Sequence, residues 1–364
     1  MEAANGARHY PFERVERLAA MILSATGASD SEAKTVVHYL VRADMAGHAS
    51  HGVLRVKQYV EQIGMRQIVC HTTPHLINDG HGFAILDGKL SFGQIGAAHA
   101  TRLACEKAAT QGIAMVGLRN SAHVGRLGDW VELAARLGCA SFHFVNTLAA
   151  PTVAPWGSKD RRLSTNPLAW GMPVAGAEPI VVDLTTAVVA EGKVRLARAA
   201  GKKIPAGWIV NRDGQSSTDP DDLYNGGALL PLGGLDAGHK GYALSLMVDL
   251  MAGAISGGGA SGPGRKINCN NFTVIAIDTT RVSPDHAVET EAAQFANWIR
   301  SAAPLDVSHP VLLPGEIERA ALLRHQRDGI SLDDGVVAAL CDAAMAAGLS
   351  ADIVNQLLEN TGAR

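Results

Sequence analysis

The chain has 364 residues, of which 47% are hydrophobic and 18% charged, and its formal net charge is −3. These values predict an ordered globular protein with two or three lobes around one large core. A slightly acidic chain without a basic run argues against nucleic acid or an anionic membrane surface as the main partner, so we expect a small-molecule ligand. Five scattered cysteines without a CxxC pair, no secretory signal pattern and no apolar run near ~20 residues predict a cytoplasmic protein without a membrane span.

Helical patterns come first in the chain. Residues 11–46 contain two of them, each ending at a glycine suited to a C-terminal cap. Residues 44–64, "DMAGHASHGVLRVKQYVEQIG", predict a third helix from His51 to about Ile63, with Ser50 as its N-cap. At 100° per residue, His51, Arg55 and Tyr59 then fall on one face, away from an apolar stripe of valines and isoleucine.

Short β-branched runs and helices alternate after residue 64, which indicates an α/β layer. Residues 75–93 predict a hairpin, residues 239–256 one long buried helix, and residues 257–264 a flexible connection. Further predicted strands cover residues 113–120, 139–147, 179–186 and 272–278, and residues 200–236 resemble a loop. We therefore expect three segments: a helical one over 1–75, a central α/β region over 76–285 and a helical one over 286–364.

The cluster around His51 combines a histidine that titrates near neutral pH with an arginine that can hold a carboxylate by two hydrogen bonds. Together they suit the binding and protonation of a 2-oxo acid. Two alternatives stay open. The polar face can simply meet water, or Asp44, His48 and His51, spaced D-x3-H-x2-H, can hold zinc in a metal-dependent hydrolase.

A second polar cluster, "RNSAHVGRLGDW" at residues 119–130, lies between a predicted strand and a predicted helix. Loops in this position commonly build sites in α/β proteins, so Asn120, Ser121 and His123 are candidates to face a ligand. A turn in which a serine or asparagine caps the following helix explains this polar cluster equally well.

The tract "GGGASG" at residues 257–262 matches the dinucleotide pattern GxGxxG. That motif requires a strand before it and a helix after it. Here a long helical pattern precedes the tract and "PGRKIN" follows, so we reject a Rossmann site. A bound nucleotide needs another architecture.

Six motifs in order give the chain a resemblance to a known family. They are "GHASHGVLRVKQY", "NSAHVG", "STNPLAWGMP", "VVDLTTAVVAEGKV", "LPLGGLDAGHKGYALSLMVDLMAG" and "PGEIE" followed by "DGISL". The sequence resembles the type-2 malate/L-lactate dehydrogenases, NAD(P)-dependent oxidoreductases that lack the Rossmann fold. The resemblance implies a mixed-sheet α/β fold with helical N- and C-terminal segments, a homodimer, and hydride transfer between nicotinamide and C2 of a small 2-hydroxy or 2-oxo carboxylate such as malate or lactate. Reduction of a cyclic imino acid such as piperideine-2-carboxylate, which the family also includes, is the alternative.

The residue patterns and the resemblance together predict roles for particular residues. The catalytic candidates are His51 as acid/base, Ser50 and Asp183, and the substrate-binding candidates are Arg55, His123 and Tyr59. The candidates for binding NAD or NADP are His48, Asn120, Thr165, Asn166, Pro167, His239, Lys240, Gly315 and Glu316.

The chain departs from the family pattern at Ser164, where a glycine is usual, and at residues 185–187. Residues 195–208, predicted as a loop, carry Arg195, Arg198, Lys202 and Lys203. These cations can read the 2′-phosphate of NADP or can simply be solvated. The sequence therefore leaves the choice between NAD and NADP, and the identity of the substrate, open.

Overall fold

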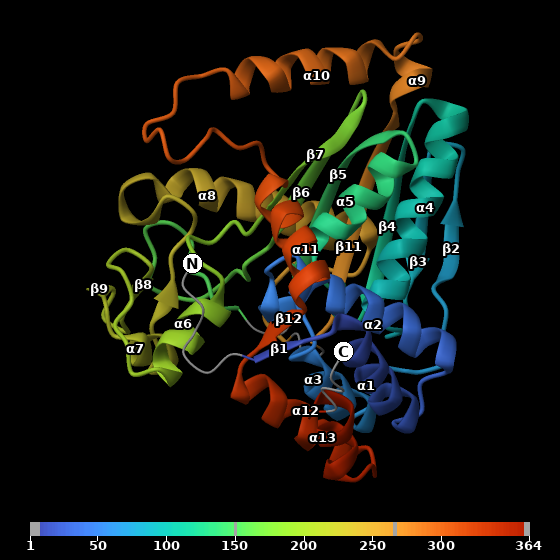
Figure 1. Cartoon of the computed structure of the whole chain (residues 1–364). Coiled ribbons are helices and arrows are strands. Elements are labelled where there is room, and N and C mark those ends of the chain that lie inside the picture. The colour runs from blue at the N-terminus through green and yellow to red at the C-terminus, as the bar shows by residue number, and fades with distance from the viewer. Residues whose placement is uncertain (1–7, 149–150, 265–267, 360–364) are drawn as a thin grey trace.

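The computed structural model describes residues 8–148, 151–264 and 268–359 (Figure 1). The helices are α1 (Phe12–Ala25), α2 (Asp30–Met45), η1 (Ala49–His51, 3-10), α3 (Arg55–Gly64), α4 (Gly93–Gln111), α5 (Leu127–Arg136), α6 (Glu191–Ala199), α7 (Pro220–Tyr224), α8 (Gly234–Asp249), η2 (Leu250–Ala254, a π-helix), α9 (Thr279–Val282), α10 (Ala287–Arg300), α11 (Glu316–Asp328), α12 (Asp334–Ala346) and α13 (Ala351–Glu359). The strands are β1 (Arg8–Tyr10), β2 (His75–Asp79), β3 (Phe83–Asp87), β4 (Ile113–Ser121), β5 (Cys139–Thr147), β6 (Leu168–Val174), β7 (Ala177–Leu184), β8 (Ile209–Val210), β9 (Ser216–Ser217), β10 (Ala228–Leu229), β11 (Asn270–Asp278) and β12 (Ile330–Leu332). Among the described helices, none is long and apolar enough to cross a membrane.

A seven-stranded mixed sheet forms the centre of the molecule, in the order β2-β3-β4-β11-β5-β6-β7. Only β3 and β4 run parallel; the other neighbours in this sheet are antiparallel. A Rossmann sheet is mostly parallel, so the expected mixed-sheet, non-Rossmann fold is confirmed. The short strands make two small separate sheets, β1-β12 and β10-β8-β9.

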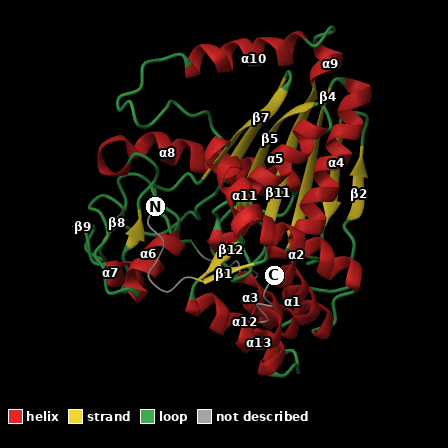
Figure 2. Ribbon diagram, in the orientation of Figure 1, coloured by secondary structure: helices red, strands yellow, loops and turns green. Residues whose placement is uncertain are grey.

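Helices cover the two faces of the large sheet because successive strand residues point to opposite sides. Leu118 of β4 packs toward Gly96 of α4, whereas Gly117 approaches Ser256, just after η2. Helices α4 and α5 therefore lie on one face, and η2 contacts the strands from the other (Figure 2). This arrangement leaves the strand ends free to carry side chains into a site.

Separate hydrophobic cores hold the parts together. One core joins α1, α2 and α3 to α12 and α13 near the two ends of the described chain. A second lies between the sheet and helices α4 and α5, where Trp130 and Phe272 are fully buried. A third, smaller core lies beneath α6 and α7 and includes Val194 and Ile209. The division of the chain at residues 75 and 285 stays a prediction.

Most predicted elements occur in the structure, and two expectations about helices are wrong. The segment predicted as one long buried helix forms most of α8 and the π-helix η2, and Leu244, Met247 and Leu250 are 38%, 52% and 42% exposed. The predicted helix from His51 to Ile63 begins only at Arg55, and Leu54, not Ser50, is its N-cap. Strand β6 was not expected, since it contains Gly171 and Pro173, which disfavour strand interiors.

A histidine in the interior of the sheet gives a pH-dependent stability. His143 of β5 is completely buried, and this burial lowers the pKa of its imidazole from 6.5 to about 3. Below pH 6.5 this imidazole therefore binds a proton in the unfolded chain but not in the folded one. His143 thus lowers the free energy of unfolding as the pH falls.

Replacing His143 with phenylalanine removes the titration. Between pH 7 and pH 5 the unmodified protein should lose about 2 kcal/mol of unfolding free energy relative to the variant, as measured by urea denaturation at each pH. His75, which is exposed in β2, provides the control, because His75→Phe should leave the pH dependence unchanged. Parallel pH profiles of the protein and His143→Phe would contradict the prediction.

Candidate active site

A buried carboxylate shapes the turn that carries His51. Asp44, near the end of α2, accepts a hydrogen bond from the backbone N–H of Val53 at 2.7 Å, and burial raises the pKa of its carboxyl to about 8. A Cβ atom on Gly52 would lie 1.8 Å from Oδ1 of Asp44. The chain therefore wraps closely around this carboxyl group, and the wrap explains why His51 ends a 3-10 turn instead of beginning α3.

The residues on this turn line a cavity of about 390 Å³. Three parts of the fold provide its walls: the turn and α3, the ends of the central strands with the loops that follow them, and the lobe of α6 and α7. Of the predicted site residues, the cavity brings together Ser50, His51, Arg55, His123, Thr165 and Pro167. Side chains from positions 50 to 167 thus meet in one place.

Arg55 and His51 are fixed side by side at the cavity wall. The hydroxyl of Ser50 lies 3.0 Å from Nδ1 of His51, so Ser50 contacts the imidazole directly and does not cap a helix. Arg55 donates from Nε to the carbonyl oxygen of Ser50 at 2.7 Å and from one terminal nitrogen to Gln58 at 2.6 Å. These bonds orient the guanidinium before any ligand arrives.

A second histidine faces the first. The rings of His51 and His123 stack with centroids 5.4 Å apart and an angle of 27° between their planes. Behind them, the hydroxyl of Tyr59 lies 2.8 Å from Nδ1 of His123. Tyr59 is only 1% exposed, so it supports His123 from behind and does not line the cavity.

Burial controls the charges in this cavity. Burial, assisted by the nearby charge of Arg55, lowers the pKa of His51 to about 3 and holds the pKa of His123 well below its usual value. Both rings are therefore neutral at physiological pH. Burial also lowers the pKa of Arg55, yet the guanidinium stays charged, and within the described parts of the chain it forms no ion pair with a carboxylate.

The lobe of α6 and α7 forms another part of the wall and carries Arg195, which the sequence placed in a loop. Arg195 belongs to helix α6, whose first residue, Glu191, accepts a hydrogen bond from the hydroxyl of Tyr224 of α7 at 2.6 Å. Arg195 lines the same cavity as Arg55, whereas Arg198 pairs with Asp221 and lies over the ring of Tyr224. The prediction of a loop at 195–199 is therefore wrong, because these residues belong to α6.

The predicted cofactor segment at residues 165–167 is held by a buried polar network. Asn166 has a positive φ of 33° and donates from Nδ2 to Asp249 at 3.1 Å. Asp249 also accepts from Asn146 at 2.7 Å and from the backbone N–H of Ser261 at 2.9 Å. The network fixes Thr165 and Pro167 at the cavity and leaves Oδ1 of Asn166 buried without a partner in the described chain.

Three other predicted site residues lie outside the cavity. Asp183, at the end of β7, accepts a hydrogen bond from the backbone N–H of Gly128 at 2.7 Å, and burial raises its pKa. His48 lies 3.4 Å from Glu318 of α11. The side chain of Asn120 donates to Asp87 at 3.2 Å. Asp183 thus holds the start of α5 and makes no recorded contact with His51, and the proposed roles of all three stay predictions.

The remaining cofactor candidates lie in the second turn of α8 and at the start of α11. His239 packs against Trp156 with ring centroids 5.6 Å apart, and both His239 and Lys240 are exposed on α8. Gly315, with a φ of 93°, precedes α11. Glu316 accepts a hydrogen bond from the backbone N–H of Leu313 at 2.6 Å and pairs with Arg300. These positions also stay predictions.

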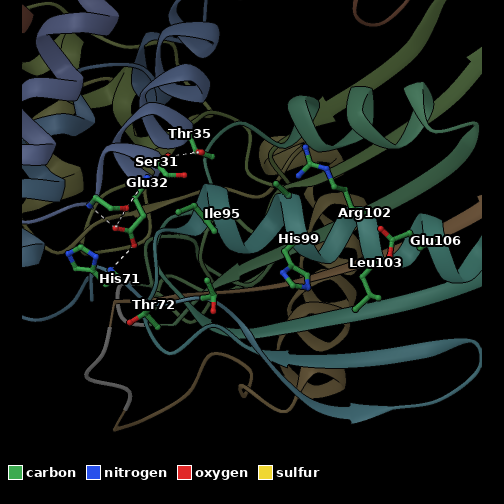
Figure 3. A pocket seen from close by; sticks show the side chains of 13 residues that line it. Ser31, Glu32, Thr35, His71, Thr72, Ile95, His99, Arg102, Leu103 and Glu106 are labelled. Carbon is green, nitrogen blue, oxygen red and sulfur yellow. Dashed lines mark hydrogen bonds between the residues drawn. The ribbon is translucent and has the colours of Figure 1, made fainter.

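A second hollow, of about 710 Å³, lies between α2, the segment at residues 71–73 and α4 (Figure 3). The carboxylate of Glu32 in its wall is already bonded to the backbone N–H groups of Ser29 and His71. His99 and Arg102 belong to α4 at the edge of this hollow, and both are exposed. Because this hollow lacks buried, convergent polar groups, the cavity beside His51 is the better candidate for catalysis.

Comparison with known proteins identifies the class. The family model for malate/L-lactate dehydrogenase matches residues 10–341. The chain belongs to this family of nicotinamide-dependent oxidoreductases, and it is an enzyme.

Individual relatives agree with that assignment. Hydroxycarboxylate dehydrogenase B of Escherichia coli (strain K12) is 37% identical over 332 residues, which is 89% of this chain and 90% of that protein. The structure of malate dehydrogenase from Pyrococcus horikoshii superposes with a TM-score of 0.86 at 31% identity and covers 96% of this chain and 98% of that one. The structure of Δ1-piperideine-2-carboxylate reductase from Pseudomonas syringae has a TM-score of 0.82 at 29% identity, with 93% of this chain and 100% of that chain covered.

The alternative of a metal-dependent hydrolase at Asp44, His48 and His51 is wrong. The family and its relatives are dehydrogenases and reductases. The structure gives the physical reason, because the carboxylate of Asp44 faces the backbone of Val53 and His48 faces Glu318. The three side chains therefore do not converge, and the described residues contain no group of three potential metal ligands.

Some site residues could not be found from the sequence. Gln58 lies on the same predicted helix as Arg55, so the helical spacing could have placed the two side chains together. Glu191 and Tyr224 come from a lobe far along the chain, and no local pattern connects them to His51. Gln94 packs behind His123 and lies in "SFGQIG", a stretch without any site signal. Only the fold brings these residues together.

Proposed function

We propose that the protein transfers a hydride between a nicotinamide dinucleotide and C2 of a small 2-hydroxy or 2-oxo carboxylate. One observation carries the proposal: a neutral histidine stands beside a partly buried arginine that has no carboxylate partner within the described chain. A charge removed from water is costly unless an opposite charge meets it. A substrate carboxylate at Arg55 provides that charge and brings its C2 oxygen toward His51.

In this proposal the residues have distinct tasks. Arg55 binds the carboxylate with a guanidinium that Ser50 and Gln58 already orient. His51, neutral in the free enzyme, accepts the hydroxyl proton when a hydroxy acid is oxidised. In the reverse direction His51 must first gain a proton, and a carboxylate at Arg55 favours this because it offsets the positive charge that lowers the pKa of His51.

The nicotinamide group, when bound, supplies or accepts the hydride. The residues present fit such a group: Thr165 and Pro167 line the cavity, and the bond from Asn166 to Asp249 holds the segment between them in place. Lys240 provides an exposed positive charge in the second turn of α8, and such a charge can meet a phosphate. We propose NAD or NADP without choosing between them, because Arg195 lies with the substrate residues and Arg198 is paired with Asp221.

A cyclic imino acid is the second candidate substrate. It is favoured by the likeness to the piperideine-2-carboxylate reductase, since such a ring carries the same carboxylate beside the reducible carbon. Arg55 can bind both kinds of molecule in the same way.

Oxidation of NADH and of NADPH, followed by absorbance at 340 nm, tests the proposal. Pyruvate, oxaloacetate and Δ1-piperideine-2-carboxylate are offered separately, with acetate as a carboxylate that has no reducible C2. We expect turnover of at least one 2-oxo acid and none with acetate. Turnover of the imino acid alone supports the second candidate, and no turnover of any of the three contradicts the proposal.

Replacing Arg55 with lysine tests the carboxylate site. A lysine keeps the charge but loses the planar pair of donors, so KM for the oxo acid should rise by roughly tenfold while the dissociation constant of NADH stays unchanged. Steady-state kinetics and NADH fluorescence measure the two values. Lys57→Arg, on the same helix and paired with Asp342, is the control and should change neither. An unchanged KM in Arg55→Lys would remove Arg55 from substrate binding.

We also propose that the protein is a cytoplasmic homodimer. The sequence has five scattered cysteines without a CxxC pair, which suits a reducing compartment. The apolar side chains of α8 and α10 support the dimer, since Met247, Phe295 and Trp298 are 52%, 53% and 68% exposed. Helix α10 also extends beyond the end of the sheet (Figure 1). Light scattering on the purified protein distinguishes a dimer from a monomer.

A further inference from the structure

A buried chain of hydrogen bonds ends at His123. Gln94, in the first turn of α4, donates from Nε2 to the hydroxyl of Tyr59 at 2.8 Å, and that hydroxyl lies 2.8 Å from Nδ1 of His123. Gln94 and Tyr59 are 0% and 1% exposed, so water does not compete for these bonds. The three groups come from α4, α3 and the loop after β4.

This series of hydrogen bonds has a direction. A tyrosine hydroxyl has a single proton, and here its oxygen already accepts the hydrogen bond from Gln94. Its own proton therefore goes to Nδ1 of His123. Burial raises the pKa of Tyr59 to about 12 and keeps the pKa of His123 far below its usual value, so neither group changes its protonation state near pH 7. With Nδ1 accepting, the ring proton of His123 must be on Nε2.

We propose that Gln94 is a positioning residue which, through Tyr59, fixes His123 as a hydrogen-bond donor to the substrate at Nε2. The inference deepens the proposed function and rests on it for the identity of the substrate. His123 lines the cavity, and Nε2 is its only ring nitrogen not used by Tyr59. A donor there matches the C2 oxygen of a 2-oxo acid, which accepts. A donor at Nε2 does not match the protonated ring nitrogen of a cyclic imino acid, because that nitrogen is itself a donor.

His51 differs in the partner of its Nδ1. The hydroxyl of Ser50, 3.0 Å away, can rotate and so can either donate to or accept from the ring. His51 can therefore gain and lose a proton with its hydrogen bond intact, whereas His123 cannot. Of two rings stacked 5.4 Å apart, one stays a fixed donor and the other exchanges the proton.

The variant Gln94→Glu should reverse the direction of the hydrogen bonds from position 94 through Tyr59 to His123. The NMR spectra are recorded at pH 9, above the pKa of about 8 that burial gives the carboxyl of Asp44, so that the new side chain is ionised. An ionised carboxylate only accepts, so the hydroxyl of Tyr59 turns toward position 94 and its oxygen becomes free to accept from His123. We expect the proton of His123 to move from Nε2 to Nδ1. The control Gln111→Glu puts the same charge at the exposed end of the same helix and should leave His123 unchanged.

Two-bond ¹H–¹⁵N correlation spectra of the full-length protein, labelled at histidine, distinguish the two tautomers. The signals of His123 are those missing from the spectrum of His123→Asn. We expect protonated Nε2 in the unmodified protein and protonated Nδ1 in Gln94→Glu. Protonated Nδ1 in the unmodified protein, or protonated Nε2 in both proteins, overturns the proposal. Should Gln94→Glu not fold, Tyr59→Phe replaces it: a mixture of tautomers supports the proposal, and an unchanged pure tautomer overturns it.

Kinetics provide the second measurement. In Gln94→Glu the ring proton of His123 is no longer on Nε2, so a hydrogen bond to the substrate is lost. We expect kcat/KM for a 2-oxo acid to fall by roughly tenfold to a hundredfold, while the dissociation constant of NADH stays unchanged. An unchanged kcat/KM in a folded, reversed variant overturns the donor role. The NMR result does not depend on turnover, so a protein that reduces no oxo acid but shows the expected tautomers contradicts the proposed function and leaves the positioning role of Gln94 supported.

Discussion

Replacing His51 with asparagine is expected to lower kcat by roughly 10²- to 10⁴-fold, the usual contribution of a general acid or base. Asparagine keeps a polar side chain of similar reach beside Ser50 but cannot exchange a proton. The dissociation constant of NADH should stay close to that of the unmodified protein, because the segment at residues 165–167 is held by Asp249 and not by His51. Stopped-flow or steady-state absorbance measures kcat, and fluorescence titration measures the binding.

An exposed histidine provides the control for this variant. His81, in the turn between β2 and β3, is exposed, and His81→Asn should change neither value. A kcat for His51→Asn within threefold of the unmodified protein would show that another group moves the proton. An equal loss of cofactor binding and turnover would show that His51 acts mainly through the cofactor.

Replacing Gly93 with alanine is expected to disturb both stability and activity. A Cβ atom at this position would lie 2.1 Å from the carbonyl oxygen of His123 and 2.4 Å from that of Ala122. Because these are backbone atoms, the new methyl group can be accommodated only if α4 or the loop carrying His123 moves. We expect a loss of about 1–3 kcal/mol of unfolding free energy, measured by urea denaturation, and at least a tenfold lower kcat/KM.

Gly64 is the matched control. It ends α3, and a Cβ atom there would meet nothing within 4 Å. Gly64→Ala should therefore keep full activity and be equal or slightly higher in stability. A Gly93→Ala variant that matches Gly64→Ala in both measurements would show that the close contact with His123 has no consequence.

Local patterns predicted much of the fold. Helices α1 and α2 lie within the two helical patterns of residues 11–46, and the hairpin of β2 and β3 lies within the predicted segment 75–93. Strand β6 could not be predicted in this way, because its pairing with β5 and β7 outweighs the cost of Gly171 and Pro173. The exposed apolar face of α8 was also out of reach, since an apolar sequence cannot say which molecule covers it.

The site was predictable where its residues are neighbours in the chain. His51 and Arg55 lie one turn apart, so a periodic pattern placed them together, although Asp44 replaces the expected helix with a tight turn. Arg195 reaches the cavity, and Gln94 reaches Tyr59 behind it, by tertiary packing alone. The sequence marked Arg195 only as a basic residue, and the fold places it in the same cavity as Arg55.

The three hydrophobic cores have a mechanical consequence. The cavity lies where they meet: His51 belongs to the part held by the core of α1–α3, His123 to the sheet, and Arg195 to the small lobe of α6 and α7. Ala122, next to His123, belongs to the first core, and Tyr39 of α2 packs on the second, so these two parts are joined by shared packing. Among the described residues, the core beneath α6 and α7 shares no member with either of them. We therefore expect the wall that carries Arg195 and Tyr224 to be the part of the cavity that moves most easily when a ligand enters or leaves.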